Sequence, residues 1–158
     1  MIDLGIHMMD AAFWVLDAPL AGVRSRLYHE GRRITGRGEV CEDFANARVD
    51  LADGCSIQLA CSWNLHAGRD AVIEASFHGT EGGAALRNVN GSFHDFTAEH
   101  FTRTTRQVLS GPGEQWGGRA AVAWVEQLAR SPAYDPAVER LIDVTAALDA
   151  IYDHAADA

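Results

Sequence analysis

The sequence contains no lysine, because all 13 of its basic residues are arginine. That absence excludes Schiff-base chemistry on a lysine amine, a lysine general base and the phosphate-binding lysine of a P-loop. Long apolar runs are also absent: none approaches the roughly 18 residues that a membrane helix needs. Residues 1–5 lack the basic and apolar regions of a signal peptide. We therefore expect a cytoplasmic protein without a membrane span.

The charge balance excludes two classes of partner. Thirteen basic residues against 22 acidic residues give a formal net charge of −9. Binding to nucleic acids and to anionic membrane surfaces rests on clustered cations, so we expect neither a nucleic-acid nor a membrane partner. Arg32, Arg33 and Arg37 form the only basic cluster in the sequence, and we interpret it as a solvated loop. The alternative is that these arginines hold an anionic substrate.

The three cysteines, Cys41, Cys55 and Cys61, are odd in number and show no spacing typical of a metal site. We expect them to be reduced and mostly buried. A zinc site built from Cys55, Cys61 and a histidine is the alternative.

The chain length and the apolar fraction predict a single globular domain over residues 1–158. The chain has 158 residues, of which 47% are hydrophobic and 22% are charged. Periodicity predicts helices over residues 4–16, 116–130 and 135–155. Strands are predicted over residues 23–30, 44–51, 55–63, 70–78, 83–89 and 92–105, with a loop over residues 31–39.

This order of elements predicts an α+β fold. We expect an open, mostly antiparallel or mixed sheet of five or six strands, with one N-terminal and two C-terminal helices. Asp53-Gly54 is a hairpin signal between two strands with alternating apolar residues. Trp63 and Trp124 are expected in the core, and Trp116 in packing or at a pocket. The glycines of residues 79–83 lie between two predicted strands, which indicates a turn and not a phosphate-binding loop.

Four side chains on the first predicted helix carry the candidate chemistry. Asp3, His7, Asp10 and Trp14 recur three or four residues apart, on a different face from the apolar residues. A carboxylate beside a histidine can hold its tautomer, and the pair then suits acid–base catalysis on a hydroxyl or carbonyl. A solvated Asp–His pair without a function is the alternative interpretation.

The residues around this pair resemble the Gfo/Idh/MocA oxidoreductase family. Residues 3–14 match its D-x-G-x-H-x-x-D-x-x-x-W stretch, and Glu42-Asp43-Phe44-Ala45 matches its E-D-x-A. Further similarities are the hairpin at Asp53-Gly54 that leads to Trp63, the G-T-E-G turn at residues 79–82, and the terminal helix with Ile151-Tyr152 and Ala155. In that helix, His154 stands where the family usually has serine.

The resemblance implies the C-terminal substrate-binding and dimerisation domain of such an oxidoreductase, which acts on a sugar-like or polyol-like hydroxyl. By this resemblance His7 and Asp3 are the candidate catalytic residues, with His7 as the acid–base. Asp10 and Trp14 are the candidate substrate-binding residues, and Asp10 is also expected to support the helix or orient His7. The resemblance further implies a homodimer through the sheet face, or a partner chain that carries a Rossmann domain.

The resemblance also implies NAD(P) as the cofactor, but we expect this chain alone to bind none. We find no strand–GxGxxG–helix unit, and without lysine the family's Glu-Lys-Pro motif cannot be present. We therefore expect a truncated relative that has no dinucleotide-binding domain. Hydride transfer would need a Rossmann domain from an upstream segment or another chain. The alternatives are a non-catalytic oligomerisation module and a cofactor-free acid–base lyase, isomerase or hydratase.

Overall fold

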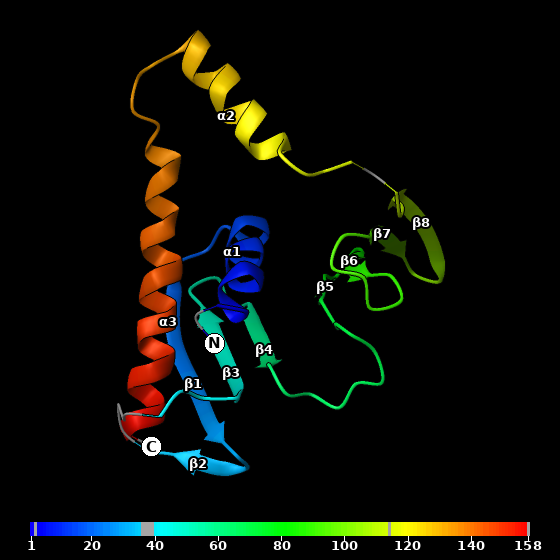
Figure 1. Ribbon diagram of the computed structural model, residues 1–158. Coiled ribbons are helices and arrows are strands. Elements are labelled where there is room, and N and C mark those ends of the chain that lie inside the picture. Colours follow the sequence, from blue (N-terminus) through cyan, green and yellow to red (C-terminus); the bar gives the residue numbers. More distant parts are fainter. Residues whose placement is uncertain (2, 36–39, 114, 158) are drawn as a thin grey trace. The chain divides into compact units, whose positions relative to one another are not determined.

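The structure, a computed structural model, describes residues 1, 3–35, 40–113 and 115–157. The chain divides into two compact units, Met1–Leu65 with Ala137–Ala158 and His66–Pro136. The first unit contains α1 (Gly5–Leu16), β1 (Leu20–His29), β2 (Arg32–Ile34), β3 (Phe44–Leu51), β4 (Ser56–Ser62) and α3 (Arg140–Asp157) (Figure 1). The second contains β5 (Glu74–His78), β6 (Gly83–Asn88), β7 (Phe96–Thr102), β8 (Thr105–Ser110) and α2 (Arg119–Arg130).

The first unit is an antiparallel sheet with two helices against one face. Sheet A has the strand order β2-β1-β3-β4, α3 packs against β1, and α1 contacts both α3 and β4. The alternating residues of β3 face these helices and are almost fully buried, as their spacing predicts: Ala45, Ala47, Val49 and Leu51. They meet Met9 and Phe13 of α1 and Ile151 of α3 in the hydrophobic core.

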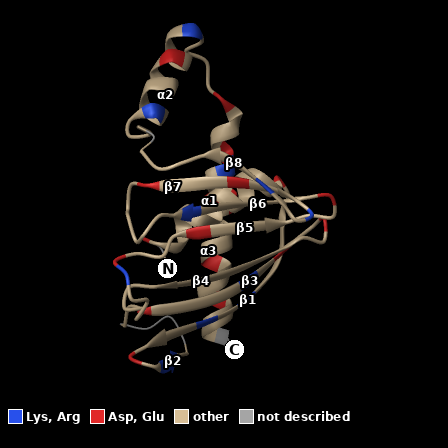
Figure 2. Cartoon of the chain, turned by 90° about the vertical axis from the view of Figure 1, so that its right-hand side faces the viewer, with Lys and Arg blue, Asp and Glu red and all other residues tan. Residues whose placement is uncertain are grey.

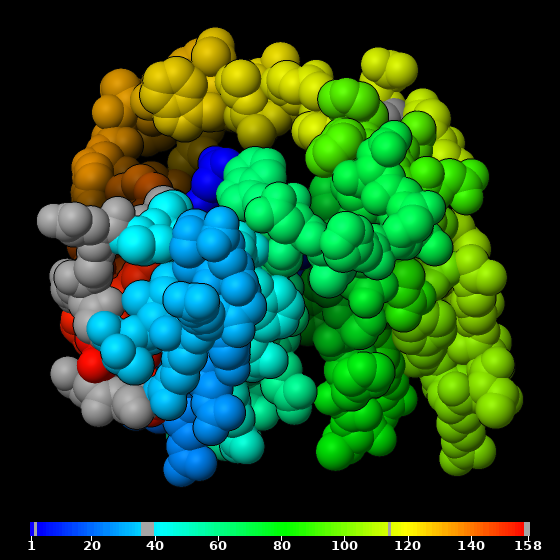
Figure 3. Space-filling view, turned by 60° about the horizontal axis from the view of Figure 1, so that its bottom comes forward, coloured from blue at the N-terminus to red at the C-terminus, as the bar shows by residue number. Residues whose placement is uncertain are grey.

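The opposite face of sheet A carries polar side chains. Arg24 and Arg26 of β1 are exposed, and they pair in register with Arg48 and Asn46 of β3. The exposed side chains of β1 and β2 form part of the light-blue surface in Figure 3. Sheet A is therefore apolar on its helix side and rich in arginine on the other.

Two turns explain where the strands of sheet A end. The Asp53-Gly54 hairpin is confirmed, since Gly54 has a φ of 91° and the Asp53 carboxylate accepts a hydrogen bond from the Cys55 amide. The prediction of a loop over residues 31–39 is wrong in part, because a tight turn at Glu30-Gly31 leads directly into β2. Residues 36–39, which include Arg37, lie outside the described residues.

The second unit is built on sheet B, which has the antiparallel order β5-β6-β7-β8. The predicted strand over residues 92–105 is wrong at its end, because Arg103, with a φ of 55°, turns the chain into β8. That turn contains no glycine, proline or asparagine, and every β8 residue before Ser110 is exposed. The sequence therefore gave neither a turn signal nor a buried stripe for this strand.

The helices near the C-terminus start later than predicted. Gly118 has a φ of 78°, so α2 begins at Arg119 and not at residue 116. The last helix begins with a short 3₁₀ turn, η1 (Pro136–Glu139), before α3. The α+β class and the three α-helices are confirmed, but the described residues form eight antiparallel strands in two sheets, compared with the five or six predicted.

Two predictions of burial are wrong. Trp63 and Trp124 are each 61% exposed. Trp63 lies directly after the end of β4, and no residue of α2 is buried. Cys41 and Cys55 are exposed and Cys61 is half-buried, although buried cysteines were expected, because Cys41 precedes β3 and Cys55 lies in the β3–β4 hairpin.

Candidate functional site

The helix α1 is fixed in place by its apolar face. Gly5, Met9, Ala12 and Phe13 are its buried residues. Gly5 lies where a Cβ atom would come within 2.4 Å of the Met1 sulfur and 3.4 Å of Leu59 on β4. The glycine of the D-x-G-x-H stretch therefore allows the start of α1 to pack closely against the sheet, which positions the residues on its other face.

The four predicted site residues lie away from this buried face. Asp3 precedes the helix and is exposed, His7 is exposed, Asp10 is half-buried and Trp14 is 65% exposed. Their spacing gives them one shared face of α1, as the sequence predicts. Among the described residues, however, no hydrogen bond joins His7 to Asp3 or Asp10. The structure thus places these side chains on one surface without forming the expected carboxylate–histidine pair.

Asp10 has a feature that its neighbours lack. Its Oδ1 atom is buried and has no hydrogen-bond partner among the described residues. A buried acceptor without a donor costs about 1–3 kcal/mol. Arg140, at the start of α3, carries a buried Nε atom that also lacks a partner. Asp10 therefore carries an unpaired acceptor, which a ligand hydroxyl reaches only if the side chain moves.

The Glu42 and Tyr152 side chains join two of the quoted motifs. The Tyr152 hydroxyl donates a hydrogen bond of 2.6 Å to the nearly buried Glu42 carboxylate, which also contacts the amino group of Met1. Burial raises the pKa of Glu42, but hydrogen bonds from the amino group and Tyr152 outweigh burial, so the net pKa lies below its usual value. This contact holds α3 against the start of β3, so both residues have a structural role.

Asp43 stabilises the neighbouring turn. Its Oδ2 atom accepts a hydrogen bond of 2.7 Å from the backbone amide of Glu30, which has a φ of 48°. The Asp43 backbone amide in turn donates to the carbonyl of Tyr28. Glu42 thus stabilises the position of α3, and Asp43 stabilises the turn at Glu30. Neither residue lies on the exposed face of α1.

Trp116 packs in the second unit. Its Nε1 atom donates a hydrogen bond of 2.6 Å to the carbonyl of His94, and its ring lies edge-on to Phe96 with centroids 6.2 Å apart. The sequence left two roles open for Trp116, packing and the lining of a pocket, and these contacts support packing.

A cavity on sheet A was not predicted. It has a volume of about 740 Å³, and Arg24, Arg26, Arg33, Arg48 and His154 are among its lining residues. Of these arginines, Arg33 was predicted to lie in a basic loop, whereas no role was predicted for those of β1 and β3. The sequence did contain a signal for two of them. Arg24 and Arg26 are two residues apart, so their side chains share one face of a strand.

The described residues do not fit a dinucleotide. The glycine-rich residues 79–83 connect β5 and β6 as an antiparallel turn, not a parallel strand to a helix. The part of the chain that the structure describes also holds no group of three or more His, Cys, Asp or Glu side chains placed for a metal ion, so the alternative zinc site is not formed there. No helix within the described ranges is long and apolar enough to cross a membrane.

Three solved structures are similar to this chain in fold. An aldose-aldose oxidoreductase from Caulobacter crescentus, complexed with glycerol, matches 97% of the chain with a TM-score of 0.69 and 16% identity. A UDP-N-acetylglucosamine 3-dehydrogenase from Acidithiobacillus ferrooxidans matches 96% with a TM-score of 0.66 and 17% identity. A 3-ketoreductase from Actinomadura kijaniata, in complex with TDP-benzene and NADP, matches 94% with a TM-score of 0.69 and 16% identity.

The chain spans 44%, 47% and 45% of the lengths of these three proteins, respectively. A sequence comparison with curated proteins finds no match. A comparison with protein families matches residues 1–85, from the site helix α1 into β6, to the GFO/IDH/MocA C-terminal domain. That match covers more than half of the 158 residues, and the chain therefore belongs to this family.

Proposed function

We propose that this chain is the substrate-binding part of a Gfo/Idh/MocA-type oxidoreductase that acts on a sugar-like or polyol-like hydroxyl. The observation that carries the proposal is the face of α1 away from its buried residues, where His7 is exposed and Asp10 is half-buried, on a helix anchored by its opposite face. The structural neighbours include an aldose-aldose oxidoreductase and a UDP-N-acetylglucosamine 3-dehydrogenase, which supports the sugar-like class.

In this proposal His7 exchanges the proton of the reacting hydroxyl. A histidine suits that task because its ordinary pKa lies near neutrality and it needs no metal to transfer a proton. Asp10 accepts a hydrogen bond from a substrate hydroxyl, since it is half-buried on the same side of α1 as His7 and no described residue pairs with its carboxylate. Asp3 orients His7 or the substrate, and the Trp14 ring supplies an apolar surface for the substrate carbons.

The oxidant in this proposal is NAD(P), which the family implies and which one structural neighbour holds as NADP. The described residues do not fit it, so its binding belongs to a Rossmann domain on a longer polypeptide or on a partner chain. This division agrees with the share of each neighbour, about 45%, that the chain covers.

The test is a turnover assay on the protein purified from its native source, together with any attached or associated domain. A panel of aldoses, inositols and nucleotide sugars is supplied with NAD⁺ or NADP⁺, and reduced nicotinamide is followed by absorbance. We expect turnover with at least one sugar or polyol, and His7→Gln should lower kcat by about 10²- to 10⁴-fold. The matched control is His78→Gln, because His78 is an exposed histidine at the end of β5.

Two results would contradict the proposal. One is full activity of His7→Gln with an intact circular dichroism spectrum. The other is the absence of turnover on the whole panel in a preparation that binds NAD(P). Asp10→Asn separates binding from chemistry, since the loss of a substrate acceptor should raise KM more than it lowers kcat.

The surface of α2 favours a second function, self-association. Its residues Ala121, Trp124, Val125 and Leu128 form an apolar stripe, and all four are exposed. The charged residues of α2 (Figure 2) are Arg119, Glu126 and Arg130. This stripe suits a homodimer, because an exposed apolar helix face loses contact with water when it pairs with a second copy.

Light scattering after gel filtration tests this second proposal. We expect Trp124→Ser to shift the protein toward the monomer, and Trp63→Ser, at an equally exposed tryptophan, to leave the mass unchanged. A monomeric wild-type protein would exclude self-association, and an unchanged dimer in Trp124→Ser would exclude α2 as its interface.

A further inference from the structure

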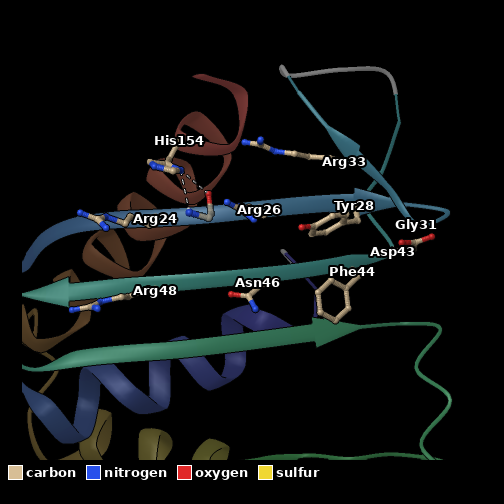
Figure 4. A pocket seen from close by; sticks show the side chains of 11 residues that line it. Arg24, Arg26, Tyr28, Gly31, Arg33, Asp43, Phe44, Asn46, Arg48 and His154 are labelled. Atoms are coloured by element: carbon tan, nitrogen blue, oxygen red, sulfur yellow. Dashed lines mark hydrogen bonds between the residues drawn. The ribbon is translucent and has the colours of Figure 1, made fainter. Parts of the chain in front are cut away.

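Arginine side chains from three strands converge on the outer face of sheet A. Arg24 and Arg26 come from β1, Arg33 from β2 and Arg48 from β3. Figure 4 shows these side chains around one cavity, which we call the arginine cavity, with Tyr28, Phe44 and Asn46 also in its lining. The register sets this arrangement, because Arg24 pairs with Arg48, Arg26 with Asn46, and Tyr28 with both Arg33 and Phe44.

The charge of the arginine cavity is opposite to that of the whole chain. The chain has a net charge of −9, but four arginines and a single aspartate, Asp43, line the cavity. Asp43 is already engaged by the backbone amide of Glu30. Arg48 donates to Asp50 at 2.8 Å, whereas Arg24, Arg26 and Arg33 form no ion pair with any described residue. Three guanidinium groups are therefore left for a ligand.

The edge of β1 adds a directed donor to the arginine cavity. β2 pairs with Leu27–His29, and no described strand lies on that side of the preceding part of β1. His154 of α3 lies there instead, and its Nδ1 atom accepts a hydrogen bond of 3.0 Å from the Ser25 amide (Figure 4). An acceptor at Nδ1 leaves the proton of the neutral ring on Nε2, where it can be donated.

We propose that the arginine cavity binds a small phosphorylated ligand, either a phosphate monoester or a diphosphate. Guanidinium groups pair with phosphate oxygens in a two-pronged geometry, and two or three of them match the charge of such a group. A carboxylate has a single charge and would leave most of the arginine charge uncompensated. The edge-on pair of Tyr28 and Phe44, with centroids 5.9 Å apart, bounds the cavity and offers an apolar surface to the organic part of the ligand.

The size of the arginine cavity agrees with this class of ligand. Small-molecule sites usually have volumes of roughly 300–1,000 Å³, and this cavity has about 740 Å³. All the described lining residues belong to the first compact unit. The arginine cavity lies on the opposite face of sheet A from α1, so it is separate from the proposed substrate site.

Binding is tested by calorimetry at low ionic strength, with inorganic phosphate, glycerol phosphate and pyrophosphate as probes. Amide chemical-shift mapping on the same protein locates the site. We expect saturable binding, with shifts at Arg24–Arg26 and at Asn46–Arg48. The variant Arg24→Gln/Arg26→Gln should weaken binding at least tenfold. Arg103→Gln is the matched control because it removes one arginine charge at an exposed turn outside the cavity.

The three probes distinguish the source of the phosphate. Tighter binding of glycerol phosphate than of free phosphate indicates a phosphate monoester, and the tightest binding of pyrophosphate indicates a diphosphate. Arg33→Gln, on the short edge strand β2, is a second variant in case the double variant does not fold, and it should weaken binding about threefold or more. The proposal is overturned if no probe binds at 10 mM, if the arginine variants bind as well as the wild type, or if the shifts lie elsewhere.

Discussion

The Tyr152→Phe variant tests the contact that joins α3 to β3. The substitution removes the hydroxyl that donates 2.6 Å to the Glu42 carboxylate and keeps the aromatic ring in place. Hydrogen bonds to charged groups contribute about 1.5–3 kcal/mol, and the nearly buried carboxylate has little access to replacement water. We therefore expect the free energy of unfolding to fall by about 2 kcal/mol at pH 7. In a chain of this size that lowers Tm by about 4–8 °C.

The same variant makes a prediction about pH. The pKa of Glu42 is lowered in the folded protein, so its contribution to stability is present above the pKa of an unfolded glutamate and is lost as the pH falls through the folded value. Tyr152 is one cause of the lowered pKa. The difference in stability between the wild type and Tyr152→Phe should therefore be largest near pH 7 and shrink below about pH 4.

Urea denaturation followed by circular dichroism, at pH 7 and at pH 3.5, measures both effects. Tyr28→Phe is the matched control, because the structure records no hydrogen bond from the Tyr28 hydroxyl to any described residue. A double-mutant cycle with Glu42→Gln compares the two backgrounds. In the Glu42→Gln protein, Tyr152→Phe should lower the free energy of unfolding by at most half as much as it does in the wild type. A loss below 0.5 kcal/mol at pH 7, or an equal loss at both pH values, would refute this account of the contact.

Three further substitutions, and Gly117→Ala as a control, probe the packing within each of the two units. Gly83→Ala places a Cβ atom 2.8 Å from the Phe77 carbonyl and should cost about 1–3 kcal/mol, whereas Gly117→Ala meets no atom within 4 Å and should be nearly neutral. Thermal unfolding of the two variants compares them, and equal stabilities would contradict the close approach. Arg87→Met removes the 3.0 Å ion pair with the buried Glu99, which Arg106 also contacts, and should cost about 1–3 kcal/mol. No change in its urea midpoint would show that Arg106 alone is sufficient. Ile151→Ala empties a fully buried site and should cost about 2–5 kcal/mol, and a smaller loss by urea denaturation would mean that the core of the first unit collapses around the gap.

The sequence predicted those parts of the fold in which local signals agree with the packing. The alternation from Ala45 to Leu51 gave β3 and its buried face, and Asp53-Gly54 gave the following hairpin. The strand β8 was missed because Arg103 makes a turn without a turn-forming residue. Trp63 and Trp124 were misplaced because residue type predicts average burial, whereas their exposure depends on where a strand ends and on what covers a helix.

The candidate site was predictable to a similar degree. Helical spacing places His7, Asp10 and Trp14 on one face, and the structure confirms the helix that carries them. Spacing alone does not set side-chain orientation, so it could not show that His7 makes no hydrogen bond with the neighbouring aspartates. The pairing of Glu42 with Tyr152 and the arginine cavity both depend on contacts between residues far apart in the sequence. Only the three-dimensional structure brings those residues together.

The central claim is that a sugar-like substrate contacts the exposed face of α1. Hydrogen-exchange mass spectrometry tests it most directly, on the NAD(P)-bound protein from its native source with and without the best substrate of the panel. We predict slower exchange in peptides that cover residues 3–16, and no such slowing in His7→Gln/Asp10→Asn. Protection by substrate that appears only elsewhere in the chain, with residues 3–16 unchanged, would contradict the account.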